Sequence, residues 1–418
     1  MNEETIELTI ERIAFRGPGV AHAGSVVCFV PETCPGERVR ARVVRRRKNY
    51  WEARVEAVLE ASPDRLPQPD CRVFTADGEA KTPGCVYDHA THEAELRWKE
   101  EQLREFLERQ ARLPDPAIAP AFASPSRLNY RNKSTMHVAR NAAGRRVLGY
   151  VGEDNETVSD QPRCPLSVDP INDALADIRA DESFWRFARP GSRLALRHTP
   201  HDGVVVSVAL PNGSLEPPEL PPLTETAPVV GDLEVPARGF WQMNPAVGTA
   251  LVEAVADEIR AAAPVRFLDL YCGVGVFGLV AAALGVPSVA GVESGRDAIA
   301  AAQRNAARLG FAGRAAFACA DAAKALPALL ADGPADGTLS LVDPPRAGLA
   351  PDAVRALLAA PPRRLLYVSC APDTLARDLA LLCAPGGGAF RLESARLFDM
   401  FPRTAHFETL CVLARAGA

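Results

Sequence analysis

The sequence predicts an α/β protein with a doubly wound, Rossmann-like domain in its C-terminal part, preceded by a small β-barrel and a β-rich middle domain. Three observations indicate this fold class. From about residue 236 onward, apolar strand-like runs alternate with alanine-rich helical stretches. A glycine-rich turn follows the first of these runs, and residues 1–60 consist of short β-like runs separated by turns. The chain of 418 residues is long enough for two or three domains, because single cores rarely exceed about 250–300 residues.

The composition is that of an ordinary globular protein. Apolar residues make up 47% and charged residues 24% of the chain, and no apolar run approaches the roughly 18 residues of a membrane span. The N-terminus, MNEETIELTIER, is acidic rather than signal-like, so we expect a cytoplasmic protein, and nothing suggests more than a monomer. Ten cysteines spread over the chain do not resemble a disulfide framework and favour core, catalytic or metal roles.

Residues 1–60 are expected to form an OB-like barrel from the runs ELTIERIAF, SVVCFV, CPGERVRARVV and YWEARVEAVL. The overall net charge of −5 does not favour a nucleic-acid partner, but between Arg38 and Lys48 the sequence holds seven basic residues and no acidic one. Such a run is usually a solvated face. Beside Tyr50 and Trp51 on a barrel strand, an RNA-binding edge is a reasonable alternative.

Residues 61–235 are assigned to the middle domain and residues 236–418 to the Rossmann-like domain. The middle domain contains a loop-rich segment over 62–90, an amphipathic helix over 92–111 and a β-rich part in which the turn Asp202-Gly203 predicts a hairpin. The strands expected after residue 236 are VRFLDLY, SVAGVE, AAFACAD, TLSLVDPP, LLYVSC and a closing FETLCVLAR.

The glycine-rich turn DLYCGVGVFGL satisfies GxGxxG through Gly273, Gly275 and Gly278. Glu293 ends the next strand, where a carboxylate can bind ribose hydroxyls, so a dinucleotide-dependent oxidoreductase is one interpretation. Asp269 leads the turn and can accept hydrogen bonds from the loop amides or from a ligand ammonium group. The strand ends that follow carry Asp321, Asp343 and Cys370, for which hydride transfer has no obvious use. These features favour S-adenosylmethionine over a dinucleotide.

Cys370 closes the run YVSC and is followed at once by a helix with Pro372 in its first turn. In a parallel sheet, ligands bind at the carboxyl ends of the strands. The dipole of the following helix is expected to stabilise a thiolate there and to lower the pKa of Cys370. The alternative is a small buried hydrophobic residue.

Six motifs together make the sequence resemble the uracil-5-methyltransferase family of RNA enzymes, in particular the 23S ribosomal-RNA branch with an N-terminal TRAM domain. They are GFWQMNP (239–245), DLYCGVGVFGL (269–279), GVE (291–293), DPPRAG (343–348), YVSC (367–370) and FPRTAHFETL (401–410). The resemblance covers nearly the whole chain. Arg346 stands where amino-methyltransferases usually carry an aromatic residue that stacks on the base, which agrees with a different chemistry.

The resemblance implies a site for each reactant. The nucleophile would be Cys370 and the base Glu408, with His406 nearby as a structural residue. The implied contacts of S-adenosylmethionine are Gln242, Tyr271, Glu293 and Asp343, with Asp321 near the adenine. A thiolate adding to carbon 6 of uracil makes carbon 5 able to accept a methyl group, and a carboxylate can then remove the carbon 5 proton.

The resemblance also implies RNA contacts in the middle domain, where RLNYRNKSTMHV brings Arg127, Tyr130, Arg131 and Lys133 together. The family uses the matching YRNK stretch beside its substrate RNA, while a surface strand is the alternative. The barrel favours ribosomal over transfer RNA as the partner, by resemblance. A noncatalytic RNA-binding or ribosome-assembly factor with a decayed catalytic domain is the hypothesis from another class, and the oxidoreductase comes third.

The ribosomal branch often carries a 4Fe-4S cluster held by four cysteines. This chain offers Cys71, Cys85 and Cys164, but Thr82 occupies the first position of the expected CxxC pair. Three thiolates can hold a cluster if another group completes it, although four cysteines are the norm. The alternative is a vestigial loop stabilised by packing.

Overall fold

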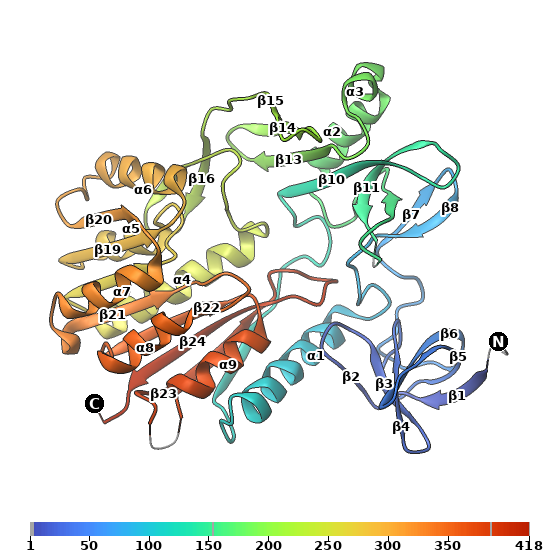
Figure 1. The fold of residues 1–418 in the computed structure, drawn as a ribbon, viewed down its shortest axis with the longest axis horizontal. Helices are drawn as coiled ribbons and strands as arrows, with labels where there is room; N and C mark the ends of the chain where they lie inside the picture. Colours follow the sequence, from blue (N-terminus) through green and yellow to red (C-terminus); the bar gives the residue numbers. More distant parts are fainter. Residues whose placement is uncertain (1–3, 153, 385–386, 418) are drawn as a thin grey trace.

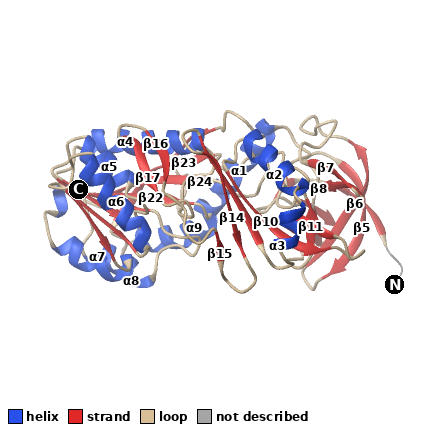
Figure 2. Cartoon of the chain, turned by 90° about the horizontal axis from the view of Figure 1, so that it is seen from above, coloured by secondary structure: helices blue, strands red, loops and turns tan. Residues whose placement is uncertain are grey.

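The structure is a computed structural model that describes residues 4–152, 154–384 and 387–417. The chain forms three parts, with the barrel, the middle sheet and the C-terminal α/β part following one another in sequence (Figure 1). In Figure 1 the C-terminal part lies on the left, the middle sheet at the upper right and the barrel at the lower right. Figure 2 shows the chain from above, where the middle sheet and the barrel overlap on the right. The predicted fold class is confirmed. No helix of the described residues is both long and apolar enough to cross a membrane.

The N-terminal part is a six-stranded sheet in the order β1-β5-β6-β4-β3-β2. The chain between β1 and β2 closes it into a barrel, because the Ile10 amide donates to the Glu37 carbonyl at 2.9 Å and the Glu11 amide to the Val20 carbonyl at 2.8 Å. The strands are β1 (Thr5–Thr9), β2 (Arg12–Ile13), β3 (Gly19–Ala23), β4 (Val26–Val30), β5 (Arg38–Arg46) and β6 (Tyr50–Glu60).

The middle part is built on an antiparallel sheet in the order β12-β11-β10-β13-β14-β15. The predicted hairpin is β13–β14, which turns at Asp202-Gly203, where Gly203 has φ +70°. One face of the sheet packs on helix α2 and buries an apolar cluster. The elements are β7 (Arg72–Thr75), β8 (Gly78–Lys81), α1 (His92–Glu105) with its π-helical continuation η1 (Phe106–Gln110), β10 (Lys133–Arg140), β11 (Arg146–Val151), β12 (Val158–Asp160), α2 (Asp169–Ala180), α3 (Glu182–Phe187), β13 (Arg193–Thr199), β14 (Gly203–Ala209) and β15 (Leu215–Glu216).

The C-terminal part is an eight-stranded sheet in the order β20-β19-β18-β21-β22-β24-β23-β9. Neighbouring strand residues such as Phe267 and Leu268 are buried on opposite faces in two separate cores, which is why these strands read as continuous apolar runs. The strands after residue 236 are β18 (Arg266–Leu270), β19 (Ser288–Glu293), β20 (Ala315–Cys319), β21 (Thr338–Val342), β22 (Arg364–Ser369), β23 (Phe390–Phe398) and β24 (Glu408–Arg415). The helices are α4 (Pro245–Ala262), α5 (Val276–Ala283), α6 (Arg296–Arg308), α7 (Ala322–Ala331), η2 (Ala335–Gly337), α8 (Pro351–Ala359) and α9 (Pro372–Leu382).

Three segments assigned to the middle domain pack on this sheet instead. The first is α1 with η1, whose Leu103 and Leu107 belong to one of its two cores. Strand β9 (Ile118–Phe122) pairs in parallel with β23 and so covers an edge whose backbone groups would otherwise lack partners. The hairpin β16 (Leu223–Ala227) and β17 (Gly231–Val235) is bound to α6, because the Asn305 side chain accepts from the Glu234 amide at 2.8 Å and donates to its carbonyl at 2.9 Å. Neither β9 nor β23 was expected from the sequence.

A buried ionic network attaches α1 to the segment after β23. Lys99 Nζ donates to Glu95 Oε1 at 2.6 Å, to Asp399 Oδ1 at 2.9 Å and to the Phe401 carbonyl at 3.2 Å. His92 Nε2 lies 2.7 Å from Asp399 Oδ2. Burial alone would lower the pKa of Lys99, but the two carboxylates outweigh it and raise that pKa, so the amine stays charged.

Arg403, which is fully buried, holds the same segment to the N-terminal half of the chain. Its amide donates to Glu95 Oε1 at 2.7 Å, and its guanidinium donates to the carbonyls of Tyr87 at 3.0 Å and Ala90 at 2.7 Å. The guanidinium also pairs with Asp70 at 2.6 Å. Residues 399–403 are therefore held by α1 and by the loop before it.

We predict that Lys99→Met lowers the free energy of unfolding by about 3–5 kcal/mol, because the buried Glu95 and Asp399 would lose the ammonium group that contacts them both. The measurement is urea denaturation followed by circular dichroism. Arg109→Met is the matched control, since its ion pair with Glu105 at 2.6 Å is solvent-exposed and such pairs contribute about 0–1 kcal/mol. Equal losses in the two variants would contradict the prediction.

Candidate active site

Three strand ends meet at one edge of the C-terminal sheet. Asp343 follows β21 and Cys370 follows β22, whereas Glu408 begins β24, which runs antiparallel to β22. The register pairs Ser369 with Thr409, so the next residues along the ladder, Cys370 and Glu408, come opposite each other. The structure thus brings together the thiol and the carboxylate that the sequence placed 38 positions apart.

The environment of Cys370 raises the pKa of its thiol to about 11. Burial is the main cause, the charge of Glu408 follows, and Asp343 adds to it, whereas Arg346 acts in the opposite direction. The expected lowering of this pKa by the helix dipole is wrong, because desolvation and two nearby carboxyl groups outweigh the dipole. Cys370 is therefore a neutral thiol at neutral pH.

Both carboxyl groups beside the thiol are also held toward their neutral forms. Burial raises the pKa of Glu408 well above its ordinary value, Asp343 adds to this, and Arg346 opposes it. Burial, with a contribution from Glu293, raises the pKa of Asp343 to about 7. A cation bound beside these groups would lower both pKa values.

The loop that carries Arg346 is fixed by helix α9. Thr374 Oγ1 donates to the Arg346 carbonyl at 3.0 Å, and the Arg377 guanidinium donates to the Ala347 carbonyl at 2.9 Å. Asp378 accepts from the Leu349 amide at 2.7 Å. Sequence reasoning gave Arg346 no site role, although its place inside DPPRAG, directly after a strand end, was an available signal.

The glycine-rich turn joins β18 to α5 and is organised by the buried Asp269. Asp269 Oδ2 accepts from the Gly278 amide at 2.7 Å, as the sequence predicted, while Oδ1 is buried with no hydrogen-bond partner among the described residues. Burial raises the pKa of Asp269 to about 7, against the effect of the Gly278 hydrogen bond. Gly275 has φ +81°, and a Cβ there would lie 2.7 Å from the Phe317 ring, so a side chain is excluded.

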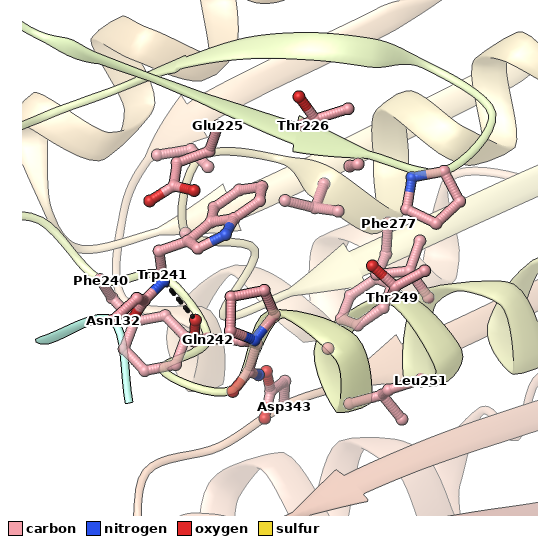
Figure 3. A pocket seen from close by; sticks show the side chains of 18 of the residues that line it. Asn132, Glu225, Thr226, Phe240, Trp241, Gln242, Thr249, Leu251, Phe277 and Asp343 are labelled. Atoms are coloured by element: carbon pink, nitrogen blue, oxygen red, sulfur yellow. Dashed lines mark hydrogen bonds between the residues drawn. The ribbon is translucent and has the colours of Figure 1, made fainter. Parts of the chain in front are cut away.

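A cavity of about 400 Å³ opens between this turn and the start of α4. Gln242, Tyr271 and Asp343 line it, as expected for cofactor contacts, together with apolar side chains such as Trp241 and Phe277 (Figure 3). Its size and mostly apolar wall are typical of a pocket for a small organic ligand. Asp269 is not among the residues that line the cavity, so a contact between its unpartnered oxygen and an ammonium group of a ligand stays a prediction.

Glu293 and Asp321 end the neighbouring strands β19 and β20 but do not line the cavity. Glu293 Oε1 accepts from Ser294 Oγ at 3.0 Å and from the Gly295 amide at 2.8 Å. Asp321 is exposed and caps α7 by accepting from the Lys324 amide at 3.1 Å. Their contacts with a cofactor stay predictions.

The residues expected to contact RNA in the middle domain make mostly structural interactions. Arg127 Nε pairs with Asp70 at 2.7 Å, and the buried Tyr130 donates to the Pro402 carbonyl at 2.9 Å. Arg131 Nε donates to Tyr130 Oη at 3.3 Å. Lys133 is half-buried, and its Nζ donates to the Gly239 carbonyl at 3.3 Å.

His406 agrees with the structural role expected for it. Burial, followed by the charge of Arg346, lowers its pKa to about 4, so the imidazole is neutral at neutral pH. Its ring contacts Phe401 edge to face, with ring centroids 6.3 Å apart.

Cys71, Cys85 and Cys164 are fully buried in one hydrophobic cluster. The hydrogen bond with Cys85 and burial raise the pKa of Cys71, which keeps the thiol neutral. Thr82, at the position of a fourth cysteine, is buried, and its hydroxyl donates to Gln161 Oε1 at 3.0 Å. Among the described residues no group of three or more His, Cys, Asp or Glu side chains is placed to hold a metal ion. The residues present do not fit a four-cysteine cluster, and the 4Fe-4S cluster that the sequence left open has no support.

The glycine-rich turn, the acidic residue beneath it and the reactive strand ends define a Rossmann-like methyltransferase. Residues 263–356 match the model of a methyltransferase domain, residues 337–416 match that of tRNA (Uracil-5-)-methyltransferase, and residues 1–55 match the TRAM domain. The chain belongs to the TRAM-domain-containing RNA uracil-5-methyltransferase family. Methyltransferases of this kind use S-adenosylmethionine.

The chain is similar over almost its whole length to proteins of this family. It is 32% identical over 458 residues to an RNA methyltransferase of Thermosynechococcus vestitus, covering 98% of each chain. It is also 32% identical to the 23S rRNA (uracil(1939)-C(5))-methyltransferase RlmD of Pseudomonas aeruginosa, covering 97% of this chain and 93% of the other. The crystal structure of the Pyrococcus abyssi tRNA (uracil-54, C5)-methyltransferase with S-adenosyl-L-homocysteine shares the fold, with a TM-score of 0.71, 21% identity and coverage of 98% and 100%.

We predict that the alkylation rate of Cys370 by iodoacetamide, followed by peptide mass spectrometry, keeps rising with pH up to about 11, the pKa of this half-buried thiol. Glu408→Gln removes a negative charge that raises this pKa, so the variant should react faster at each alkaline pH. Cys319, an exposed thiol, is the internal control and should react equally in both proteins. A wild-type plateau already near neutral pH would contradict the prediction.

We predict further that protein purified without oxygen contains less than about one iron per chain and lacks the visible absorbance of a 4Fe-4S cluster, because Thr82 supplies no thiolate. Thr82→Cys restores the number of thiolates that such clusters normally need and should raise the iron content after reconstitution. Cys34→Ser, which changes a buried cysteine of another core, is the control. A stoichiometric cluster in the wild-type protein would refute this assignment.

Proposed function

We propose that this protein methylates carbon 5 of a uridine in RNA through a covalent bond between Cys370 and the base. The observation that carries the proposal is the register of β22 and β24, which sets Cys370 opposite Glu408 beside the cavity that Asp343 lines. S-adenosylmethionine, when bound, supplies the methyl group.

In the proposed reaction, Cys370 is the nucleophile and Glu408 is the base. The thiol of Cys370 gives its proton to solvent, its sulfur bonds to carbon 6 of uracil, and the electron pair of the 5,6 double bond becomes available at carbon 5. After carbon 5 has been methylated, Glu408 takes the remaining carbon 5 proton, the double bond forms again, and the thiolate leaves carbon 6. The raised pKa of Glu408 makes its carboxylate a stronger base than an ordinary glutamate.

Arg346 is the cation whose charge opposes the effect of burial on Cys370 and Glu408. It opposes the rise in the pKa of both Cys370 and Glu408 and therefore favours the thiolate that adds and the carboxylate that accepts the proton. The buried segment 399–403, held by Lys99 and Arg403, leads to Glu408 and restricts where that carboxylate can lie.

We propose ribosomal RNA as the substrate class. The support is the TRAM match at residues 1–55 and the similarity to the 23S rRNA enzyme of Pseudomonas aeruginosa. The tRNA enzyme of Pyrococcus abyssi has low sequence identity and supports the fold alone. A uridine in a loop is the favoured target, because extruding a base from a helix costs a few kcal/mol.

The two alternative functions give a role to fewer of the residues at this site. A noncatalytic RNA-binding factor would have no use for Gln242, Asp343, Cys370 and Glu408 assembled around one edge of the sheet. A dinucleotide oxidoreductase would use the glycine-rich turn and Glu293, but it gives no role to a thiol opposite a buried carboxyl group.

We predict that Glu408→Ala, incubated with S-adenosylmethionine and transcribed 23S rRNA, accumulates a protein–RNA adduct that survives denaturing electrophoresis. The reason is that Cys370 can still add to the uracil, but without the Glu408 carboxylate the carbon 5 proton is not removed and the uracil is not released. Turnover should fall by about 100- to 10,000-fold, the usual contribution of a positioned base. Cys370→Ala should lose both adduct and turnover, and a tRNA transcript is the substrate control. Absence of an adduct in Glu408→Ala would exclude Glu408 as the base, and adducts with tRNA alone would exclude ribosomal RNA.

A further inference from the structure

The basic run of the barrel, which the sequence singled out for RNA binding, is largely neutralised by its own neighbours. Strand β5 is paired with acidic side chains of β1, β6 and the chain before them. The ion pairs are Arg38 with Glu7 and Glu60, Arg40 with Glu7, Arg42 with Glu56, Arg45 with Glu52, and Arg46 with Glu4. Most of this positive charge is therefore already balanced within the barrel.

A groove of about 190 Å³ on the middle sheet differs from the barrel, because basic residues line it without acidic ones among them. Its floor holds the small side chains Thr135, Ala195, Ser207 and Ala209. The basic residues that line it are Lys133, Arg193, Arg197 and Arg238, and none of the residues lining it is acidic. We call this surface the sheet groove.

The strand period explains why these side chains share one face. Met136, Leu194 and Leu196 point into the core beneath α2, so the alternate residues of β10 and β13 point to the other face. The register sets Lys133 opposite Arg197 and Thr135 opposite Ala195. Small side chains in the centre with basic ones at the ends leave a shallow channel across the sheet.

Three of the four basic side chains have no acidic partner in the described part of the chain. Lys133 Nζ donates to the Gly239 carbonyl at 3.3 Å, Arg238 donates to backbone carbonyls of Pro217 and Pro218, and Arg193 is exposed. Burial and the charge of Arg197 lower the pKa of Lys133, as expected where cations face one another. Arg197 is the fourth and pairs with the buried Glu225 at 2.8 Å. The groove is thus electropositive, because the other three cations have no carboxylate partner among the residues that the structure describes.

The sheet groove adjoins the cavity of the active site. Arg197 Nη1 donates to the carbonyls of Pro236 at 3.2 Å and Gly239 at 3.3 Å, which holds the segment that separates the two. Asn132, next to Lys133, lines the cavity and donates to the Gln242 carbonyl at 3.4 Å. Phe240, which follows Gly239, lies beside Asn132 at the cavity and is 69% exposed (Figure 3).

We propose that the sheet groove binds the sugar-phosphate backbone of the substrate RNA at nucleotides that flank the target uridine. This inference rests on the proposed function. Unpaired guanidinium and ammonium groups complement phosphate charge, and the hydroxyls of Thr135 and Ser207 can donate to phosphate or sugar oxygens. Such contacts hold the strand without reading its sequence.

The test is methylation of transcribed 23S rRNA at several salt concentrations by the full-length chain. Arg193→Ala should raise the KM for RNA about threefold to tenfold, leave kcat within about twofold, and reduce the slope of log KM against log salt by about 0.7–0.9, as expected for one lost phosphate contact. Thr135→Glu, which adds a negative charge at an exposed position, should raise KM in the same way.

The matched control is Arg140→Ala, on the same strand β10 but with its side chain on the other face, where KM should not change. Unchanged KM and salt slope in Arg193→Ala, or an equal effect in Arg140→Ala, would overturn the inference. If the wild-type protein methylates no uridine, the proposed function fails, and filter binding of the same RNA to the same variants still decides for or against the groove.

Discussion

The antiparallel pairing of β24 with β22 is the constraint on which the site depends. In a parallel sheet only carboxyl ends of strands meet at the ligand-binding edge, and they supply Asp343 and Cys370. A strand that runs in the opposite direction adds its amino end to that edge, and this brings Glu408 beside the thiol. A register shift by one residue would turn the carboxyl group to the other face of the sheet.

The conformation of the segment between β23 and β24 is fixed by contacts with residues outside the C-terminal part. Lys99 and Glu95 of α1, with the fully buried Arg403, connect residues 399–403 to the N-terminal half of the chain. Strand β9 adds a second connection by pairing with β23. The barrel side of the molecule and the site are thereby parts of one packed structure rather than independent modules.

Local patterns were sufficient for much of the fold, whereas the candidate site residues Gln242, Cys370 and Glu408 followed from the resemblance to a family. The apolar runs of β18 to β22, the hairpin at Asp202-Gly203 and the glycine-rich turn lie where the sequence predicts them. Strands β9 and β23 were missed because IAPAF and FRLESARLF have no clear two-residue alternation. They are strands because of tertiary pairing, β23 with β24 and β9 with β23. Arg346 was missed as a site residue for the same kind of reason, since its effect comes from two strand ends far away in sequence.

The sequence by itself determined which residue types are present: a thiol after a strand, an acid before a glycine-rich turn, a carboxylate near the C-terminus, and a threonine in place of a cysteine. Only the tertiary structure decided which of these groups are protonated and which charged side chains have an ionic partner. Burial beside Glu408 and Asp343 raises the pKa of Cys370, and carboxylates neutralise the basic strand of the barrel, whereas the sheet groove keeps its charge. The physical reason is that charge and desolvation depend on distance in space, and sequence patterns report only neighbours along the chain.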